Sequence, residues 1–587
     1  MSRFRFSPRP NRAHEIAWRE WSDAAFAEAR GRDVPVLLAI SAVWCHWCHV
    51  MDETSYSTED IIALINERFV AIRVDNDERP DVNRRYNMGG WPTTAFLTPD
   101  GEIVHGGTYI PPQGMWQTLL TVSDLWRTQR DDIQRRVMDA NTQESVARTP
   151  KSGDLTPEIA DLVGAQLRGQ YDREQGGFGR EPKFPQTQVL RFLLDEYRRS
   201  DAPDLATILR TTLDAMSSRG MYDHVEGGFF RYATLRDWTV PHYEKMLEDN
   251  AELLAVYAEA HATFPDAGYD RVVRDVVRWM DAVLFQPETG LWSGSQDADE
   301  HYFTLDAQER GAHDAPFVDR TLYTSWNVLA AGAYLRAGEV LMDRAIGTRG
   351  WDAVSAIDRR LRDASGAVCR YDAGNGPQLP DLLGDAASLL SLFVGVGDLA
   401  RATALAARMR EKLEDAERGG FYDTPAGDQP GRLARRERPI EENATAASAL
   451  LRLAVKSGDQ TWREVALRAL RSFVGEYRAW GQFAASYANA VARALREPVS
   501  VVVVGRMGDA NAEALWRAAR SSGDPDLVAL HLDPAVVADT IAERGFPLDR
   551  TAAYVCIGTA CSAPLADAAS LRRELETARQ RLSSSAV

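Results

Sequence analysis

The stretch Ser41–Met51 reads Ser-Ala-Val-Trp-Cys-His-Trp-Cys-His-Val-Met and decides how the N-terminal part of the chain folds. It follows the apolar run Val34–Ile40, whose aliphatic and β-branched residues predict a short buried strand. The pattern after the cysteines is helical, so Cys45 is expected where a strand ends and a helix begins. A thiol in that place faces free backbone N–H groups and the positive end of the helix dipole, which favours its thiolate.

The Cys-x-x-Cys spacing in this context predicts thiol–disulfide chemistry. Cys45 is the candidate nucleophile, His46 adds positive charge beside it, and Cys48 is placed to attack a mixed disulfide formed at Cys45. Three alternatives stay open: a zinc site completed by Cys556 and Cys561, haem attachment through Cys-x-x-Cys-His, and a plain structural pair. We expect neither a metal nor a cofactor.

Length and composition set the broad class. A chain of 587 residues is too long for one ordinary core, so about two to four domains are expected. The hydrophobic fraction of 45% and charged fraction of 26% are typical of a soluble globular protein. The net charge of -17 argues against nucleic acid and anionic membranes as partners. With no long apolar run and no signal-type segment, we expect a cytoplasmic protein.

Helical and strand patterns alternate on both sides of the cysteines. Beyond the strand and helix already described, helices are expected at Ala17–Arg30, Thr58–Arg68 and Gln113–Arg136, and strands at Phe69–Asp75, Thr94–Leu97 and Ile103–His105.

This order resembles the thioredoxin fold. There a cis proline opens the strand after the second helix and lies against the dithiol, and Pro92 is the matching residue; the alternative is an ordinary turn proline. A cis proline would leave a strand edge free for a substrate peptide. Ala39 stands where thioredoxin has a buried aspartate, so proton transfer would fall to His49, Asp52, Glu53 or water.

Longer motifs are similar to those of the family named after spermatogenesis-associated protein 20, whose bacterial members are thioredoxin-domain proteins of unknown function. The resemblance covers nearly the whole chain and implies an N-terminal thioredoxin-like domain fused to an (α/α)6 barrel of the six-hairpin glycosidase type. Val328 and Ala446-Ala447 depart from the family pattern, and the insert after Asp299 is short, so a remodelled pocket is expected. The matching motifs are Cys45–Met51, Val74-Asp75, Glu78–Val82, Gly90–Pro92, Phe96–Pro99, Gly176–Gly179, Pro182–Pro185, Val240–Leu247, Asp249–Ala251, Gln296–Asp299, Thr324–Asn327 and Cys556–Cys561.

The middle of the chain supports a barrel independently. From Leu155 to about Arg496 the pattern is overwhelmingly helical, and a glycine-plus-aromatic signal recurs with room for two helices in each interval. Strand patterns return after Pro498. The fold class is therefore multidomain, α/β plus all-α, with a thioredoxin-like domain at 1–145, a six-hairpin barrel at 150–497 and a small α/β appendage at 498–587. The recurring signals begin at Gly176, Gly227, Gly290, Gly366, Gly419 and Gly481.

Hairpin loops of such a barrel converge at one end, where we expect a pocket. Aromatic faces beside carboxylates suit a sugar. Two carboxylates could act in glycoside hydrolysis, or a histidine could move a proton next to a carbonyl, as in the sugar epimerases and isomerases that share the fold. The alternative is that the Asp and Asn residues cap helices and loops. The candidate binding residues are Tyr222, Asp223, His224, Trp238, His242, Glu244, Asp297, Asp299, Trp326 and Asn327.

Two functions of different class follow. The first is a thiol–disulfide oxidoreductase or redox sensor with a protein disulfide as substrate, coupled to a carbohydrate-type barrel. The second is a carbohydrate-active hydrolase or sugar epimerase or isomerase with a regulatory dithiol domain; a non-catalytic binding protein is a third class. The link between these domains, roughly Asp139 to Leu155, is short, so we predict packed domains with Cys45 near their interface. No partner is predicted for Cys369.

Overall fold

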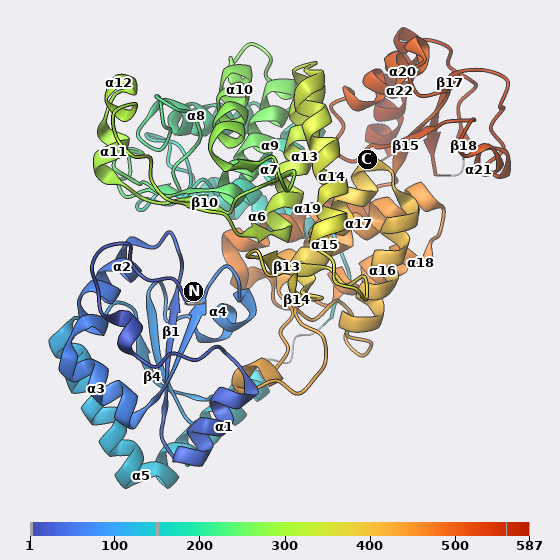
Figure 1. Ribbon diagram of the computed structural model, residues 1–587. Coiled ribbons are helices and arrows are strands. Elements are labelled where there is room, and N and C mark those ends of the chain that lie inside the picture. Colours follow the sequence, from blue (N-terminus) through green and yellow to red (C-terminus); the bar gives the residue numbers. More distant parts are fainter. Residues whose placement is uncertain (1–3, 148–151, 559, 586–587) are drawn as a thin grey trace.

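The computed structural model describes residues 4–147, 152–558 and 560–585. It consists of an N-terminal α/β domain, a helical barrel and a C-terminal α/β domain (Figure 1). The predicted class, α/β plus all-α, is confirmed. The predicted start of the barrel at residue 150 and the chain ends at 1 and 587 lie outside the described residues.

The N-terminal domain is built on a four-stranded sheet in the order β2-β1-β3-β4. Strand β1 is parallel to β2 and antiparallel to β3, with Leu38 opposite Ile72 on one side and Ala95 on the other. The aliphatic side chains of β1 are fully buried, which explains its continuous apolar sequence. The elements are α1 (Asp23–Arg32), β1 (Val36–Ser41), α2 (His46–Glu53), α3 (Glu59–Arg68), β2 (Val70–Asp75), α4 (Pro80–Tyr86), β3 (Thr93–Leu97), β4 (Ile103–Gly107) and α5 (Pro112–Ala147).

The helix expected at Ala17–Arg30 begins six residues late, at Asp23, because the chain before it joins the sheet edge. The Arg19 N–H donates to the Ala71 carbonyl, and the Arg19 carbonyl accepts from Arg73. Ser22 then caps α1 through its side chain.

Twelve helices among the described residues form a double ring. Each inner helix packs on the next, and the last packs on the first, so the ring closes. This is the (α/α)6 arrangement that the sequence predicts. The inner helices are α7 (Thr187–Ser200), α9 (Leu247–Thr263), α13 (Thr324–Val340), α15 (Leu383–Val396), α17 (Ile440–Ser457) and α19 (Ala485–Leu495). The outer helices are α6 (Glu158–Gln170), α8 (Pro203–Ser218), α10 (Tyr269–Trp279), α14 (Arg344–Arg360), α16 (Leu399–Leu413) and α18 (Thr461–Arg471).

A glycine turn precedes every inner helix, so all six turns lie at one end of the barrel, which we call the mouth. Asn250, Asn327 and Asn443 stand at the same place in three inner helices. Each amide oxygen accepts the N–H of the aromatic residue in its own turn, at 2.7 to 2.8 Å, from Phe229, Trp292 and Phe421 respectively. Short elements border the mouth: β5 (Tyr232–Ala233), β6 (Pro241–His242), β7 (Lys245–Met246), β8 (Phe285–Gln286), β9 (Leu291–Trp292), β10 (Ser295–Gln296), α11 (Glu300–Thr304), α12 (Ala307–Arg310), β11 (Val318–Asp319), β12 (Leu322–Tyr323), β13 (Cys369–Asp372) and β14 (Gln378–Pro380).

The C-terminal domain has a sheet in the order β16-β15-β17-β18. Cys556 and Cys561 form a disulfide across β17 and β18, separate from the disulfide between Cys45 and Cys48. The two pairs therefore do not form one zinc site. Cys369 is a free, buried cysteine, and burial raises the pKa of its thiol to about 11. The elements are β15 (Val499–Val504), α20 (Ala510–Arg520), β16 (Val528–Leu532), α21 (Ala538–Glu543), β17 (Ala552–Ile557), β18 (Ala560–Cys561) and α22 (Ala568–Ser585).

The two α/β domains occupy opposite ends of the barrel (Figure 1). At the mouth, the buried Arg85 of α4 makes a two-pronged ion pair with Asp423, at 2.7 and 3.1 Å. Short helix η4 (Gly431–Ala434) reaches from the barrel into the N-terminal domain, where Leu433 joins the core under the sheet. At the far end, Arg520 of the C-terminal domain pairs with Glu339 of α13. Among the described helices, none combines the length and low charge that crossing a membrane requires.

Candidate functional site

Cys45 and Cys48 lie where the N-terminal domain packs against the barrel mouth. Cys45 is the N-cap of α2, and its sulfur accepts the Cys48 N–H at 3.2 Å, as its place between β1 and α2 dictates. The two residues are only 4% and 2% exposed, and they share one hydrophobic core with the inner helices. The prediction that Cys45 lies at an interface of packed domains is confirmed, and the Trp91–Pro92 peptide beside it is cis, as the resemblance implies.

Trp44, the residue before Cys45, bridges the two domains. Its indole N–H donates to Asp77 at 2.7 Å, and the guanidinium of Arg231, from the barrel, stacks 3.9 Å from its ring centroid. Burial raises the pKa of Asp77, although the Trp44 hydrogen bond and the charges of Arg370 and Arg231 oppose this. The sequence motif contains Trp44, but the pattern of residues gave no signal for Arg231, whose role arises only when the domains pack.

Asp297 is a buried carboxyl next to the dithiol helix. Burial raises its pKa to about 6; the charge of His49 and the Ala298 N–H act against this rise, and Glu244 adds to it. A carboxyl that titrates near neutral pH in a shielded place is suited to proton transfer. Asp297 and His49 come from different domains, so the packing brings a predicted barrel residue to the dithiol.

His242 and Glu244 complete this group. The His242 Nδ1 lies 3.6 Å from Glu244 Oε1, and its ring stacks on Tyr232 with centroids 4.4 Å apart. Glu244 is 2% exposed, and its Oε2 has no hydrogen-bond partner among the described residues. The Arg231 N–H donates to the Glu244 carbonyl, which links this group to Trp44.

A hollow of about 410 Å³ lies beside the dithiol, lined by Trp47, Trp91, Thr108 and Tyr109. His46 is exposed and touches Trp47 edge-on, with ring centroids 5.9 Å apart. Half of Trp47 is also exposed, so this hollow gives a molecule from solution an aromatic surface near Cys45.

Asp223 lies inside the barrel wall, where its carboxylate binds Lys245 and Arg310. Burial opposes its ionisation, but these two charges prevail and lower its pKa. The same turn recurs elsewhere with Asp172 bonded to the buried Lys183 at 3.0 Å. Because the same turn forms elsewhere without a ligand, the turn alone accounts for the position of Asp223. This agrees with the alternative that the Asp and Asn residues cap helices and loops.

Other predicted binding residues are also engaged by the fold. The structure leaves ligand binding by them untested. Asn327 bonds to the turn before α13; the Tyr222 hydroxyl donates to Asp275 at 3.0 Å; the Trp238 indole donates to the Gln175 carbonyl at 3.1 Å; Asp299 caps α11; Trp326 is buried against Tyr323; and His224 is exposed, with Nε2 3.3 Å from the Arg219 carbonyl.

A cavity of about 2080 Å³ runs along the barrel axis between the two α/β domains. Glu248 and Glu441 line its mouth end, each the second residue of an inner helix. The Glu248 side chain is exposed to the cavity and that of Glu441 is half-buried. Their depth within the molecule, together with neighbouring carboxylates such as Glu252, raises the pKa of Glu248 to about 8 and that of Glu441 to about 7. Sequence reasoning missed both, although each lies two residues before an asparagine that the barrel repeats, Asn250 and Asn443, which is a usable signal.

Residues 9–144 match the family model Thioredox_DsbH, described as "Protein of unknown function, DUF255". Over 307 residues the chain is 34% identical to an uncharacterised protein of Caenorhabditis elegans and to human spermatogenesis-associated protein 20. These alignments cover 48% of this chain and 41% and 39% of the two relatives, so the match spans about two fifths of the relatives' length.

Two solved structures that resemble the barrel are as follows. D-mannose isomerase has a TM-score of 0.45 at 11% identity, covering 54% of this chain and 85% of that one. Cellobiose 2-epimerase from Bacillus thermoamylovorans has a TM-score of 0.43 at 11% identity, covering 54% and 86%. Likenesses at this level do not transfer activity, so function rests on the site itself. The N-terminal domain thus matches the DUF255 family model, and about half of the chain shows distant homology to spermatogenesis-associated protein 20.

Proposed function

We propose that Cys45 and Cys48 form a thiol–disulfide switch that senses redox state at the mouth of the barrel. The observation that carries this proposal is their burial under barrel residues, with Trp44 held between Asp77 and Arg231. A folded protein substrate cannot reach sulfurs that are almost fully covered. A small thiol or an extended segment entering through the aromatic hollow beside Cys45 is the better fit.

A low-molecular-weight thiol can supply the two electrons that reduce the disulfide. Its thiolate attacks the Cys45 sulfur, the bond to Cys48 breaks, and Cys48 leaves with the electron pair and takes a proton. A second thiolate then attacks the mixed disulfide, which releases Cys45 as a thiolate and the reductant as its disulfide. His49 is the nearest candidate for the proton, because the Asp52 carboxylate is bonded to Arg73 at 2.8 and 2.9 Å.

A chain of adjacent residues connects the dithiol to the barrel. Cys45 is covalently next to Trp44, whose ring carries Arg231. Arg231 is in turn next to Tyr232, the stacking partner of His242. Opening the disulfide frees the first turn of α2, so the packing of this chain of contacts is expected to change.

Glutathione redox buffers applied to the full chain test the switch. Trapped thiols would be counted by mass spectrometry, and backbone hydrogen exchange followed over residues 230–245. We expect both thiols to appear together, with faster exchange in that segment, and no such change in Cys45→Ser, which has no disulfide to open. Thiols that never appear, or rapid reduction of insulin disulfides by the protein, would contradict a buried switch.

A second candidate function is acid–base chemistry on a polyhydroxy compound in the cavity. It is supported by Glu248 and Glu441, which hold protons near neutral pH and line the same mouth. Sugar epimerisation or isomerisation would exchange a carbon-bound proton with solvent. Proton exchange by unmodified sugars in D2O, followed by NMR and lost in Glu248→Gln, is the expected result; absence of exchange and of any thermal shift across a sugar panel would contradict it.

A further inference from the structure

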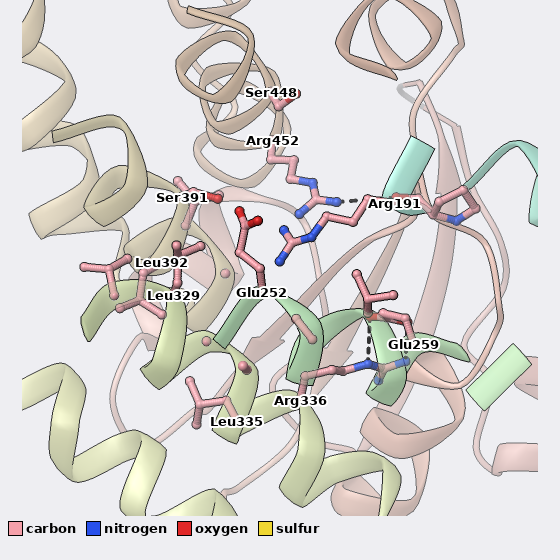
Figure 2. Close-up of a pocket in the computed structure, with 18 of the residues that line it drawn as sticks. Arg191, Glu252, Glu259, Leu329, Leu335, Arg336, Ser391, Leu392, Ser448 and Arg452 are labelled. Carbon is pink, nitrogen blue, oxygen red and sulfur yellow. Dashed lines mark hydrogen bonds and ion pairs between the residues drawn. The ribbon is translucent and has the colours of Figure 1, made fainter. Parts of the chain in front are cut away.

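Two arginines from different inner helices line the barrel cavity. Figure 2 shows Arg191, from α7, and Arg452, from α17, with their guanidinium groups directed toward the same part of the cavity. Arg191 makes no hydrogen bond or ion pair with another described residue. Arg452 has one contact, to the Pro525 carbonyl at 3.4 Å. Two guanidinium groups therefore face the same space without a carboxylate between them.

Acids lie near this pair, but none of the described ones forms an ion pair with either arginine. The charges of Asp195 and Asp526 act on Arg452, and Asp195 accepts from the Asn489 amide at 2.7 Å. Glu252 lies beside the pair in Figure 2, but its oxygens accept from Thr187 and, at 2.7 Å, from Gln188. Asp526 is paired with Arg199. The positive charge of Arg493 and then burial lower the pKa of Arg452 to about 9, which reflects the excess of positive charge.

Hydroxyl groups line the same space. Ser391 of α15 and Ser448 of α17 point into it in Figure 2, and neither side chain bonds to another described residue. Lys456, one turn beyond Arg452, is buried and donates to the Val394 carbonyl at 2.7 Å. Hydroxyl donors and two guanidinium forks that line one cavity are groups that can bind the oxygen atoms of a phosphate group.

Beside the C-terminal domain the cavity lining includes four exposed arginines, of which Arg520 and Arg579 pair with Glu339 and Asp201, although the protein as a whole carries a net charge of -17. Such a local concentration of positive charge draws anions toward this part of the cavity. The four exposed arginines are Arg517, Arg520, Arg572 and Arg579.

We propose that the barrel cavity contains an anion site that binds the phosphate group of a phosphorylated polyhydroxy compound through Arg191, Arg452 and the hydroxyls of Ser391 and Ser448. The polyhydroxy part extends toward the carboxyl groups at the mouth: Glu441 and Arg452 are separated by about 16 Å along α17. The phosphate site stands on its own observations, while the identity of the rest of the ligand rests on the second candidate function.

Calorimetric titration of the full chain tests this with three probes: inorganic phosphate, glucose 6-phosphate and glucose. We expect the phosphate ester to bind most tightly and inorganic phosphate to compete with it. Arg191→Gln and Arg452→Gln should each weaken binding of the ester about 10- to 100-fold, the range for losing a charge-assisted hydrogen bond in a shielded place. Arg452→Lys, which keeps the charge but loses the fork, should fall between. Arg506→Gln, the same change on an exposed arginine outside the cavity, should bind like the wild type.

The outcomes separate the two proposals. Inorganic phosphate that binds and is lost in both cavity variants supports the anion site, even if glucose 6-phosphate binds no better. Glucose that binds as tightly as its phosphate overturns the anion site and leaves the polyhydroxy ligand standing. Equal binding of the ester by the wild type and Arg452→Gln also overturns it. Thermal unfolding of each variant shows that it is folded, since removing one of two like charges is not expected to destabilise the barrel.

Discussion

The two ends of the barrel are both covered by an α/β domain, but they differ in how far their charged side chains are buried and paired. At the mouth, charges are buried in matched pairs such as Arg85 with Asp423, each under 5% exposed. At the far end Arg199 and Asp526 form another buried pair, but the pair of Arg520 with Glu339 is partly exposed, and Arg452 makes no ion pair with a described acid. The mouth is built as a fixed joint between domains, whereas the far end keeps charge available for a ligand.

Breaking the joint at the mouth should have the largest effect. Arg85→Ala leaves the buried Asp423 with only the more distant Arg84, 3.9 Å away, so we expect a loss of about 3–5 kcal/mol in the free energy of unfolding. Chemical denaturation measures it. Arg127→Ala, at an exposed position of α5, is the control and should change stability little. An equally small loss for Arg85→Ala would show that the mouth is no more tightly joined than the surface.

The turns at the mouth give the next effect. Asn327→Ala and Asn443→Ala each remove an amide that makes three bonds to a buried turn, so both should lose about 2–4 kcal/mol of stability. Asn327 is a sequence-predicted binding residue and Asn443 is not. If both asparagines are only structural, the two folded variants should bind glucose 6-phosphate with the same affinity, measured by calorimetry. A further loss of affinity only in Asn327→Ala would restore the binding role.

Residue patterns predicted the scaffold well and the site in part. Strand β2 was expected at Phe69–Asp75 and spans Val70–Asp75, because a continuous apolar run has few other places to go. Asp223 is a predicted binding residue, and the same Tyr-Asp-x-x-x-Gly-Gly-Phe pattern at Asp172 was a sequence signal for the structural role that the turn gives it. Arg231 was missed because its partner, Trp44, is remote in the chain and reaches it only by domain packing.

Asp297 gives a pH-dependent test at the mouth. Its pKa in the folded protein is raised to about 6, above the ordinary value for aspartate, so the folded state holds the proton more tightly. The fold consequently loses stability as pH rises from about 4 to about 6, by about 1–3 kcal/mol. Asp297→Asn should therefore be more stable than the wild type at pH 7 and equal to it at pH 4. Thermal unfolding across this range measures the difference, and a gap that does not change with pH would contradict the assignment.

The smallest effect is expected at the far end. Arg520→Gln breaks a partly exposed pair with Glu339, for which about 0–1 kcal/mol is the ordinary cost. Denaturation in low and high salt measures this cost and its screening. A loss as large as that of Arg85→Ala would mean that the far end is also a fixed joint, and the contrast between the two ends would fail.

The insertion of η4 has a consequence for how this protein is made. Leu433 completes the core of a domain whose own strands end more than 300 residues earlier, and the Arg432 N–H bonds to the Tyr86 hydroxyl across 346 residues of sequence. On the ribosome, the N-terminal domain emerges long before this piece is synthesised. Until the segment that carries η4 has been synthesised, the site for Leu433 in this core stays uncovered. A chain truncated before η4 is therefore expected to bind chaperones and to aggregate.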